Sequence, residues 1–397
     1  MTQLACRIAA AAAALVAAVC LAGTVLLGWE DHLALLWTRA GIEEAIRLAP
    51  GDARNYDALA GLDGPDRIWA LERLSEVNPY DSLARIELGL LAELQGDRTR
   101  AERLLIEAAR VDKTYAPRWS LANFYFRSND PAKFWPWLRE AARMSYGDPR
   151  GLAQLAWDLA EDAPEGLAAL SDRQPVLESY VSLLLDNNRL GPAETAANKL
   201  LEVYGKEAAG AVLVHCDRFL NAGRPEAALR LWNRLAGARL ISARPLDPER
   251  GPHLTNGDFG SEPLSRGFDW RLPPVEGVEM VRLPAGAGLR FSFSGRQPED
   301  CMLMLERVPL APDRSWRLRF EYRSQGMAAE TGLRWRTIGA ESQAPASEAW
   351  REAVFEFKSP PGASVVPLAL AYQRAPGTTR MEGSFWLRRV RLERAGR

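Results

Sequence analysis

The sequence predicts a multidomain chain that is α-helical first and β-stranded afterwards, with one transmembrane helix, an α-solenoid of helical hairpins and a C-terminal antiparallel β-sandwich. Three observations predict this order. The chain has an uncharged run near its N-terminus, then a helical pattern that repeats after 34 residues, and after Gly237 short segments in which apolar and polar residues alternate. Its 397 residues are enough for two or three domains.

The uncharged run extends from Ile8 to Gly28 and has about the twenty residues that a bilayer-spanning helix needs. Arg7 precedes it, and basic residues favour the cytoplasmic side. We therefore expect residues 1–28 to form a single-pass anchor, crossing a bacterial inner membrane through residues 8–28, with the bulk of the chain in the periplasm. A cleaved signal peptide is the alternative. The small residues Ala22 and Gly23 lie inside the run, which favours an uncleaved anchor.

The overall charge is balanced, with 50 Lys and Arg against 51 Asp and Glu, and gives no reason to expect a nucleic-acid partner. From Arg250 onward, however, 22 basic residues stand against 17 acidic ones, and every basic residue except Lys358 is an arginine. Arginine suits the recognition of carboxylates and phosphates. The same composition also suits solvated strand faces, and both interpretations stay open at this point.

The sequence predicts no catalytic residue, metal site or cofactor. Its three histidines are far apart and lack Cys, Asp or Glu at ligand spacing, and no nucleotide-binding or hydrolase motif is present. The cysteines do not form a disulfide framework, since Cys6 and Cys20 belong to the expected anchor and Cys216 and Cys301 fall in different expected domains.

The helical part is a repeat array. The segment NPYDSLARIELGLLAELQGDRTRAERLLIEAARVD begins at Asn78, and DKTYAPRWSLANFYFRSNDPAKFWPWLREAARMSY begins 34 residues later at Asp112. Each unit has the pattern of a helix, a short polar turn and a second helix. A helical hairpin cannot bury its apolar stripe alone, so neighbouring hairpins should stack into a solenoid with a concave groove.

These units resemble the tetratricopeptide repeat, whose 34 residues form two antiparallel helices. The packing positions of that family are recognisable in Gly89, Ala101, Ala108 and Pro79. The resemblance implies a solenoid over residues 29–240 that binds protein partners. We expect five units, one of them degenerate near residues 167–174.

One repeat is unusually rich in aromatic residues, and two interpretations are open. The cluster could be an exposed patch for a partner or the core of a bulky repeat, and its helical spacing favours the core. It comprises Trp119, Phe124, Tyr125, Phe126, Phe134, Trp135 and Trp137.

Beyond a Pro-rich linker at residues 241–252, residues 253–397 alternate between apolar and polar side chains. The segment WRLRFEYR, from Trp316, places its apolar residues on one face and its charged residues on the other. Similar segments are GLRFSFSG, GLRWRTIG, EAVFEFKS and FWLRRVRLER. CMLMLERVPL and VVPLALAYQR are two further candidate strands. They predict eight or nine short strands and hence a β-sandwich.

Three motifs in this region resemble jelly-roll carbohydrate-binding modules of the galactose-binding-like type. They are NGDF at 256–259, FDW at 268–270 and GSFWLRRVRLER near the C-terminus. The resemblance implies a jelly roll whose first strand contains NGDF and which stacks sugars on aromatic side chains. This chain departs from the pattern, because Gly260, Arg388 and Arg389 occupy positions where such modules carry acidic residues. We therefore assign no calcium ion.

The candidate glycan contacts combine tryptophans with arginines from the predicted strands. They are Trp270, Trp335, Trp350, Arg317, Arg319, Arg334 and Arg336.

The sequence thus supports the hypothesis of a non-enzymatic, membrane-anchored envelope scaffold. Its repeats would bind protein partners, and its sandwich would bind polysaccharide, as an accessory to exopolysaccharide or O-antigen assembly or export. This step rests on analogy between folds. Two alternatives stay open: a purely structural assembly protein that binds no sugar, and a carbohydrate-active enzyme. Tryptophans that are all buried would favour the first, and a cluster of acids in a deep pocket would favour the second.

Overall fold

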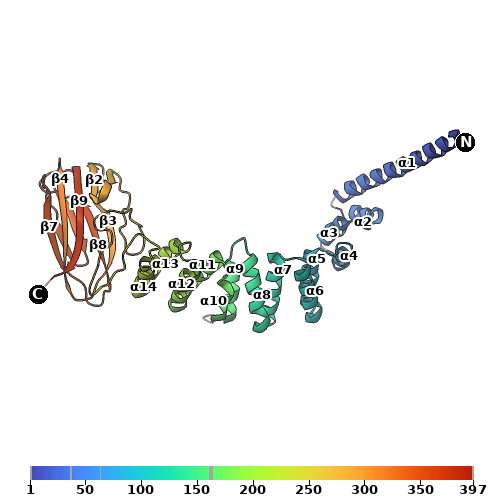
Figure 1. Ribbon diagram of the computed structural model, residues 1–397, viewed down its shortest axis with the longest axis horizontal. Helices are drawn as coiled ribbons and strands as arrows, with labels where there is room; N and C mark the ends of the chain where they lie inside the picture. The colour runs from blue at the N-terminus through green and yellow to red at the C-terminus, as the bar shows by residue number, and fades with distance from the viewer. Residues whose placement is uncertain (1, 36–37, 63, 161–163, 396–397) are drawn as a thin grey trace. The chain divides into compact units, whose positions relative to one another are not determined.

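A computed structural model of the chain describes residues 2–35, 38–62, 64–160 and 164–395. It confirms the predicted order of an N-terminal apolar helix, helices in tandem and two antiparallel sheets (Figure 1). The chain divides into two compact units, Met1–Asp172 and Arg173–Arg397. We describe each unit by itself.

The described residues of the first unit form ten helices. In chain order they are α1 (Thr2–Leu35), α2 (Arg39–Leu48), α3 (Ala53–Ala60), α4 (Arg67–Val77), α5 (Ser82–Leu94), α6 (Arg98–Val111), α7 (Tyr115–Arg127), α8 (Pro131–Met144), α9 (Arg150–Ala160) and α10 (Pro164–Leu170).

The first helix is long and apolar enough to cross a membrane between Ala12 and Leu33, with a mean hydropathy of 2.2. A signal sequence would pass the same test. The end of α1 also packs on the helices that follow: a Cβ on Gly41 would lie 2.7 Å from the Leu33 carbonyl oxygen, and Asn55 Nδ2 donates to Glu30 Oε1 at 2.6 Å. The helix therefore continues beyond the predicted end of the anchor at Gly28 and joins the first helices of the repeat region.

Helices α3 to α10 form consecutive hairpins because small residues let paired helices approach closely. A Cβ on Gly89 of α5 would lie 2.9 Å from Leu105 Cγ of α6, and Ala101 and Ala108 of α6 have no exposed surface. Aspartates start several of these helices by accepting a backbone N–H bond: Asp52, Asp81, Asp97 and Asp130.

The aromatic cluster of α7 and α8 divides between the core and the surface. Phe124, Tyr125 and Phe134 are buried, as the core interpretation predicts, whereas the other four residues of the cluster are half-buried.

The described residues of the second unit form four α-helices, one short 3-10 helix at Pro284–Gly286 and nine strands. The helices are α11 (Gln174–Asp186), α12 (Leu190–Tyr204), α13 (Ala209–Asn221) and α14 (Pro225–Gly237). The strands are β1 (Val278–Arg282), β2 (Leu289–Ser294), β3 (Asp300–Pro309), β4 (Ser315–Gln325), β5 (Leu333–Thr337), β6 (Ala340–Gln343), β7 (Arg351–Lys358), β8 (Val365–Gln373) and β9 (Glu382–Arg394).

The described residues thus contain six helical hairpins between Ala53 and Gly237, four in the first unit and two in the second, rather than the five repeats expected. The additional hairpin is α3/α4, whose sequence resembles the repeat only at its start. The degenerate unit is α9/α10, in which α10 has only seven residues.

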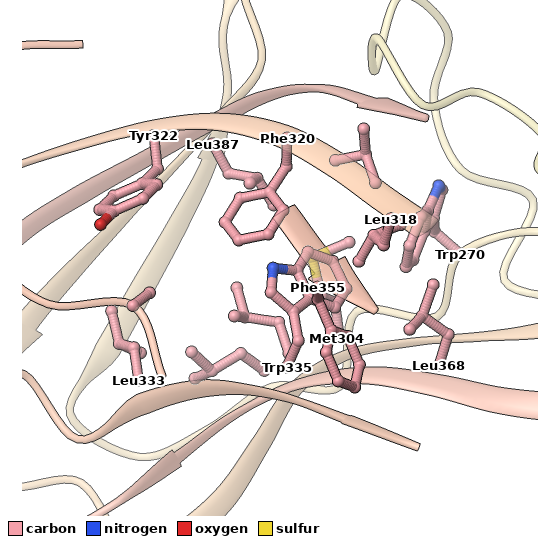
Figure 2. Close-up of a cluster of buried hydrophobic side chains, with 14 of the residues drawn as sticks. Trp270, Met304, Leu318, Phe320, Tyr322, Leu333, Trp335, Phe355, Leu368 and Leu387 are labelled. Carbon is pink, nitrogen blue, oxygen red and sulfur yellow. The ribbon is translucent and has the colours of Figure 1, made fainter. Parts of the chain in front are cut away.

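The strands form a sandwich of one five-stranded sheet, in the order β1-β2-β9-β4-β7, and one four-stranded sheet, in the order β3-β8-β5-β6. All strand pairs are antiparallel. Large side chains fill the space between the sheets. Figure 2 shows Trp335 in the middle of this core, and its ring centroid lies 5.5 Å from that of Phe320.

The prediction that NGDF lies in the first strand is wrong. Asn256 and Phe259 have φ angles of 43° and 57°, in the left-handed region that strands exclude, so these residues form a loop. Phe259 is nevertheless buried in the sandwich core, and the loop is held against β9 by a bond from the Val390 N–H to the Gly257 carbonyl at 2.8 Å. The first strand of the sandwich is β1, at Val278–Arg282.

The last helical hairpin is joined to the sandwich within the second unit. Trp232 of α14 is fully buried and contacts Phe268 edge-on, with 5.9 Å between the ring centroids. Asp217 of α13 accepts the Gly267 N–H at 2.9 Å and forms an ion pair with Arg271. The sandwich therefore covers apolar surface that a terminal repeat would otherwise expose.

Candidate functional site

The four arginines predicted to contact glycan lie on opposite outer faces of the sandwich. In β4 the residues Trp316 and Leu318 point into the core, so Arg317 and Arg319 point outward from the five-stranded sheet. Arg317 pairs with Glu356 of β7 at 2.7 Å. Arg319 pairs with two acids on the flanking strands, at 2.7 and 3.2 Å.

The other two predicted arginines point outward from the four-stranded sheet. Leu333 and Trp335 of β5 lie in the core, so Arg334 and Arg336 alternate away from it. Arg334 pairs with Glu341 at 3.0 Å, and Arg336 pairs with an aspartate of β3 at 3.0 Å. The four arginines therefore do not come together in one site, and each already has an acidic partner.

Two of the three predicted tryptophans have no surface to offer to a sugar. Trp270 and Trp335 are both fully buried in the sandwich core. The Trp270 indole N–H donates to the Thr255 carbonyl at 3.1 Å, which holds the ring inside. These two residues therefore do not contact a glycan. Alternation along β5 directs Trp335 inward, and packing of the opening loop directs Trp270 inward.

The third tryptophan, Trp350, is half-buried at the start of β7 and belongs to a cluster on the outer face of the five-stranded sheet. The Arg388 guanidinium lies 3.8 Å from the centroid of the Trp350 ring. Arg323 lies between Trp350 and Trp386, at 5.6 and 4.3 Å from their centroids. We call Trp350, Arg323, Trp386 and Arg388 the Trp–Arg stack.

The strand register creates this stack. Arg323 of β4 lies opposite Trp386 of β9, and the residue before it, Tyr322, lies opposite Arg351 of β7, directly after Trp350. Sequence analysis missed this group because Arg323 belongs to β4 whereas Trp386 and Arg388 belong to β9, and only the strand register brings them together. The signal for them was the outward alternation of positions 386 and 388 in β9.

An acidic residue fixes the position of the cations. Arg389 Nη1 and Arg388 Nε each donate to Glu321 at 2.8 Å. These bonds, from Arg389 first and Arg388 next, hold the pKa of Glu321 below its usual range against the opposing effect of burial. Arg388 is therefore anchored over the Trp350 ring by a carboxylate that stays ionised at neutral pH.

The Trp–Arg stack offers two partly exposed indole rings with charged groups beside them. An indole ring presents a broad apolar surface together with one N–H donor, and the guanidinium groups add further donors at fixed positions. Such a surface fits a ligand that has apolar faces bordered by hydroxyl groups. Sugar rings have this character.

A pair of acids lies near the junction of the sandwich with α13 and α14, but substrate has no access to it. Glu306 and Asp269 are 0% and 1% exposed, and both are bonded to Thr255. Burial raises the pKa of each carboxyl group, that of Glu306 well above its usual value. In the described part of the chain no group of three or more His, Cys, Asp and Glu residues is placed to hold a metal ion.

A second candidate surface is an apolar stripe on α5. Leu83, Leu90 and Leu94 are 63%, 37% and 84% exposed. Their spacing of seven and four residues places them on one face of the helix. We call these three residues the α5 stripe. Contiguous exposed apolar residues are typical of surfaces that bind other proteins.

No protein-family model and no curated protein matches the sequence. Solved structures with a similar fold include tetratricopeptide-repeat proteins and carbohydrate-binding modules. The class of this protein follows from its own elements: the described residues form an α-solenoid of helical hairpins followed by an antiparallel β-sandwich.

Three of these structures represent the two kinds. A CBM4 module has 10% sequence identity and a TM-score of 0.28, covering 35% of this chain and 98% of its own. YrrB, a tetratricopeptide-repeat protein, has 13% identity and a TM-score of 0.26, covering 51% of this chain and 93% of its own. PilF of Pseudomonas aeruginosa has 13% identity and a TM-score of 0.24, covering 53% and 92%.

Proposed function

We propose that this protein is a non-enzymatic envelope scaffold that binds polysaccharide through the Trp–Arg stack and a protein partner through its helical repeats. The observation that carries the proposal is the position of Trp350 and Trp386. Three of the five tryptophans from residue 253 onward are buried in the core, whereas these two are half-buried on one outer face. Arg388 and Arg323 hold them in place.

The α5 stripe supports the second half of the proposal. Three exposed leucines on one helix face are costly to leave in water, and a protein partner with an apolar helix or loop would cover them.

The membrane location belongs to the same proposal. Helix α1 has the length and hydropathy of a membrane span, and the Arg7 side of the sequence favours the cytoplasm. With that orientation the repeats and the sandwich face the periplasm of a bacterial envelope. A scaffold that holds both a protein partner and a glycan at this membrane suits exopolysaccharide or O-antigen assembly and export.

The experiment uses the full-length chain in detergent micelles and a panel of neutral and acidic bacterial polysaccharides. We expect saturable binding to at least one polymer, weakened about tenfold or more in Trp350→Ala and in Trp386→Ala, because tryptophans at the centre of an interface contribute much of its binding free energy. Trp69→Ala is the matched control, since Trp69 is a 48% exposed tryptophan of α4, outside the sandwich. Binding that survives both sandwich variants would refute the assignment of this site.

A purely structural role is the second candidate, and one observation favours it. The sandwich is fixed to α13 and α14 through Asp217, Arg271 and Trp232, as a cap of the repeat array would be. Under this alternative no polysaccharide binds, and the sandwich serves to hold the terminal hairpin folded.

A further inference from the structure

A cleft of about 800 Å³ lies where the chain enters the sandwich. One wall is formed by the connector at residues 241–244 and the opening loop at residues 252–261, and the other by Arg389–Leu392 of β9. A β-bulge creates this shape: the register between β4 and β9 shifts at this point, and Arg389 has a φ angle of 50°. We call this feature the β9 cleft.

The charged groups that line the β9 cleft are mainly basic. Arg244, Arg389 and Arg391 contribute three guanidinium groups, and Asp258 is the one acid among the lining residues. Asp258 Oδ1 accepts the Gly260 N–H of its own loop at 3.3 Å. His253 adds no charge near neutral pH, because burial lowers its pKa.

Two of these arginines have no acidic partner among the described residues. Arg389 pairs with Glu321, but no ion pair forms at Arg244 or Arg391, and both side chains are exposed. This distinguishes them from Arg317 and Arg319 of β4 and from Arg334 and Arg336 of β5, each of which has an acidic partner. An unpaired guanidinium remains available for a ligand carboxylate or phosphate.

The β9 cleft is continuous with the outer face that carries the Trp–Arg stack. Trp386, Arg388 and Arg391 all lie on the outward side of β9. Arg391 lies five positions after Trp386, and because of the bulge their partners on β4 are only four positions apart, which corresponds to roughly 13 Å at about 3.3 Å per residue. A polymer that stacks on Trp386 can therefore extend along β9 into the cleft, whereas a small anion would occupy the cleft alone.

We propose that the β9 cleft binds the carboxylate groups of an acidic polysaccharide, so that this protein selects acidic over neutral glycans. The inference rests on the proposed glycan site of the Trp–Arg stack, and it names the class of ligand: a polymer with repeated uronate-type carboxylates. The aromatic pair binds one stretch of the polymer, and Arg391 and Arg244 bind the charges of the next.

The test compares polygalacturonate with the same polymer after methyl esterification, which removes the charge and keeps the backbone. The full-length protein in detergent micelles is titrated with each polymer at low and moderate salt. We expect the acidic polymer to bind at least tenfold more tightly, with a preference that decreases as salt rises. The double variant Arg244→Gln/Arg391→Gln should lose about tenfold or more of the affinity for the acidic polymer and none for the esterified one.

Arg296→Gln is the matched control, since Arg296 is also exposed and has no partner among the described residues. Arg296 lies two residues after Ser294, which pairs with Glu382. Glu382 is at the opposite end of β9 from Arg391, and the two are roughly 30 Å apart at about 3.3 Å per residue. Thermal unfolding of each variant checks that the exposed substitutions leave the fold intact.

Each outcome separates this inference from the proposed function. Equal binding of both polymers, lost in Trp350→Ala, would keep the glycan site and overturn the selection for acid. Acidic-polymer affinity that survives in the double variant, or falls equally in Arg296→Gln, would also overturn it. If inorganic phosphate binds at low millimolar concentration, and the double variant loses this binding but keeps its affinity for the acidic polymer, the cleft binds small anions and not a polysaccharide. If neither of these polymers nor any other polymer of the panel binds, the proposed function itself is refuted.

Discussion

The interior of the sandwich and the outer face of its five-stranded sheet use the same residue types under opposite conditions. Trp335 has no exposed surface and packs against Phe320, whereas Trp350 is half-buried with the Arg388 guanidinium over its ring. The first ring is surrounded by apolar atoms, and the second retains contact with water. The position of a tryptophan in the strand register therefore decides whether its ring stabilises the core or stays available to a ligand.

The carboxylates show the same contrast. Glu306 is fully buried, and its Oε2 atom has no partner, so desolvation raises its pKa well above the usual value. Glu321 lies on the outer face with two arginines, and its pKa is lowered. The interior therefore favours a neutral acid, and the outer face favours an anion.

The largest effect should come from truncating the interior tryptophan. Trp335→Ala should cost about 3 to 5 kcal/mol of unfolding free energy, because it leaves a cavity in a packed core. Trp350→Ala should cost about 1 kcal/mol or less, since its ring is partly solvated and loses mainly a cation–π contact. Urea unfolding followed by near-ultraviolet circular dichroism measures both. Equal losses would show that the outer tryptophan is structural, which would weaken its assignment to glycan binding.

A smaller effect should appear in the pH dependence of the unfolding free energy, with opposite signs for an acid in the interior and an acid on the outer face. The pKa of Glu306 is raised in the folded state, so its contribution is present below the usual glutamate pKa of 4.5 and is lost as pH rises toward the folded value. Glu306→Gln should therefore become more stable relative to the natural protein as pH rises over this range, by at most about 1.4 kcal/mol per pH unit.

Glu321→Gln is the matched control for this experiment. The folded pKa of Glu321 is lowered, so its contribution is present above 4.5 and is lost as pH falls. The stability difference between this variant and the natural protein should therefore change only as the solution is acidified below that value. The same pH profile for both variants would contradict the contrast between interior and outer face.

Much of the fold could be predicted because its determinants are local. The 34-residue repeat, in which Ala108 corresponds to Ala142, identifies helical hairpins, and alternation in β4 and β9 identifies strands from their own residues. The two strands without a predicted segment, β1 and β6, are sheet-edge strands of five and four residues. Edge strands bury little, so their sequences alternate weakly.

The candidate site was less predictable because it depends on contacts between distant segments. The burial of Trp335 was available from its alternation with Leu333 in β5. That of Trp270 was not, since it lies outside any named strand and is held by a bond to Thr255. The pairing of the outward arginines and the stack of Trp350 with Arg388 follow from the strand register, which joins residues up to 74 positions apart in the sequence.

The smallest effect should come from a paired arginine on the outer face. Arg319→Gln removes a cation that two acids already neutralise, Glu352 and Glu393. Because exposed ion pairs contribute about 1 kcal/mol or less, the unfolding free energy should change by no more than this amount. Affinity for an acidic polysaccharide should also stay within about twofold, since the variant leaves two unpaired acids that repel the ligand only weakly at moderate salt. Arg391→Gln, which removes an unpaired cation from the same face, should weaken binding by more. A loss in Arg319→Gln as large as that in Arg391→Gln would show that ion pairing does not decide which arginines are available, and the charge argument for the β9 cleft would then fail.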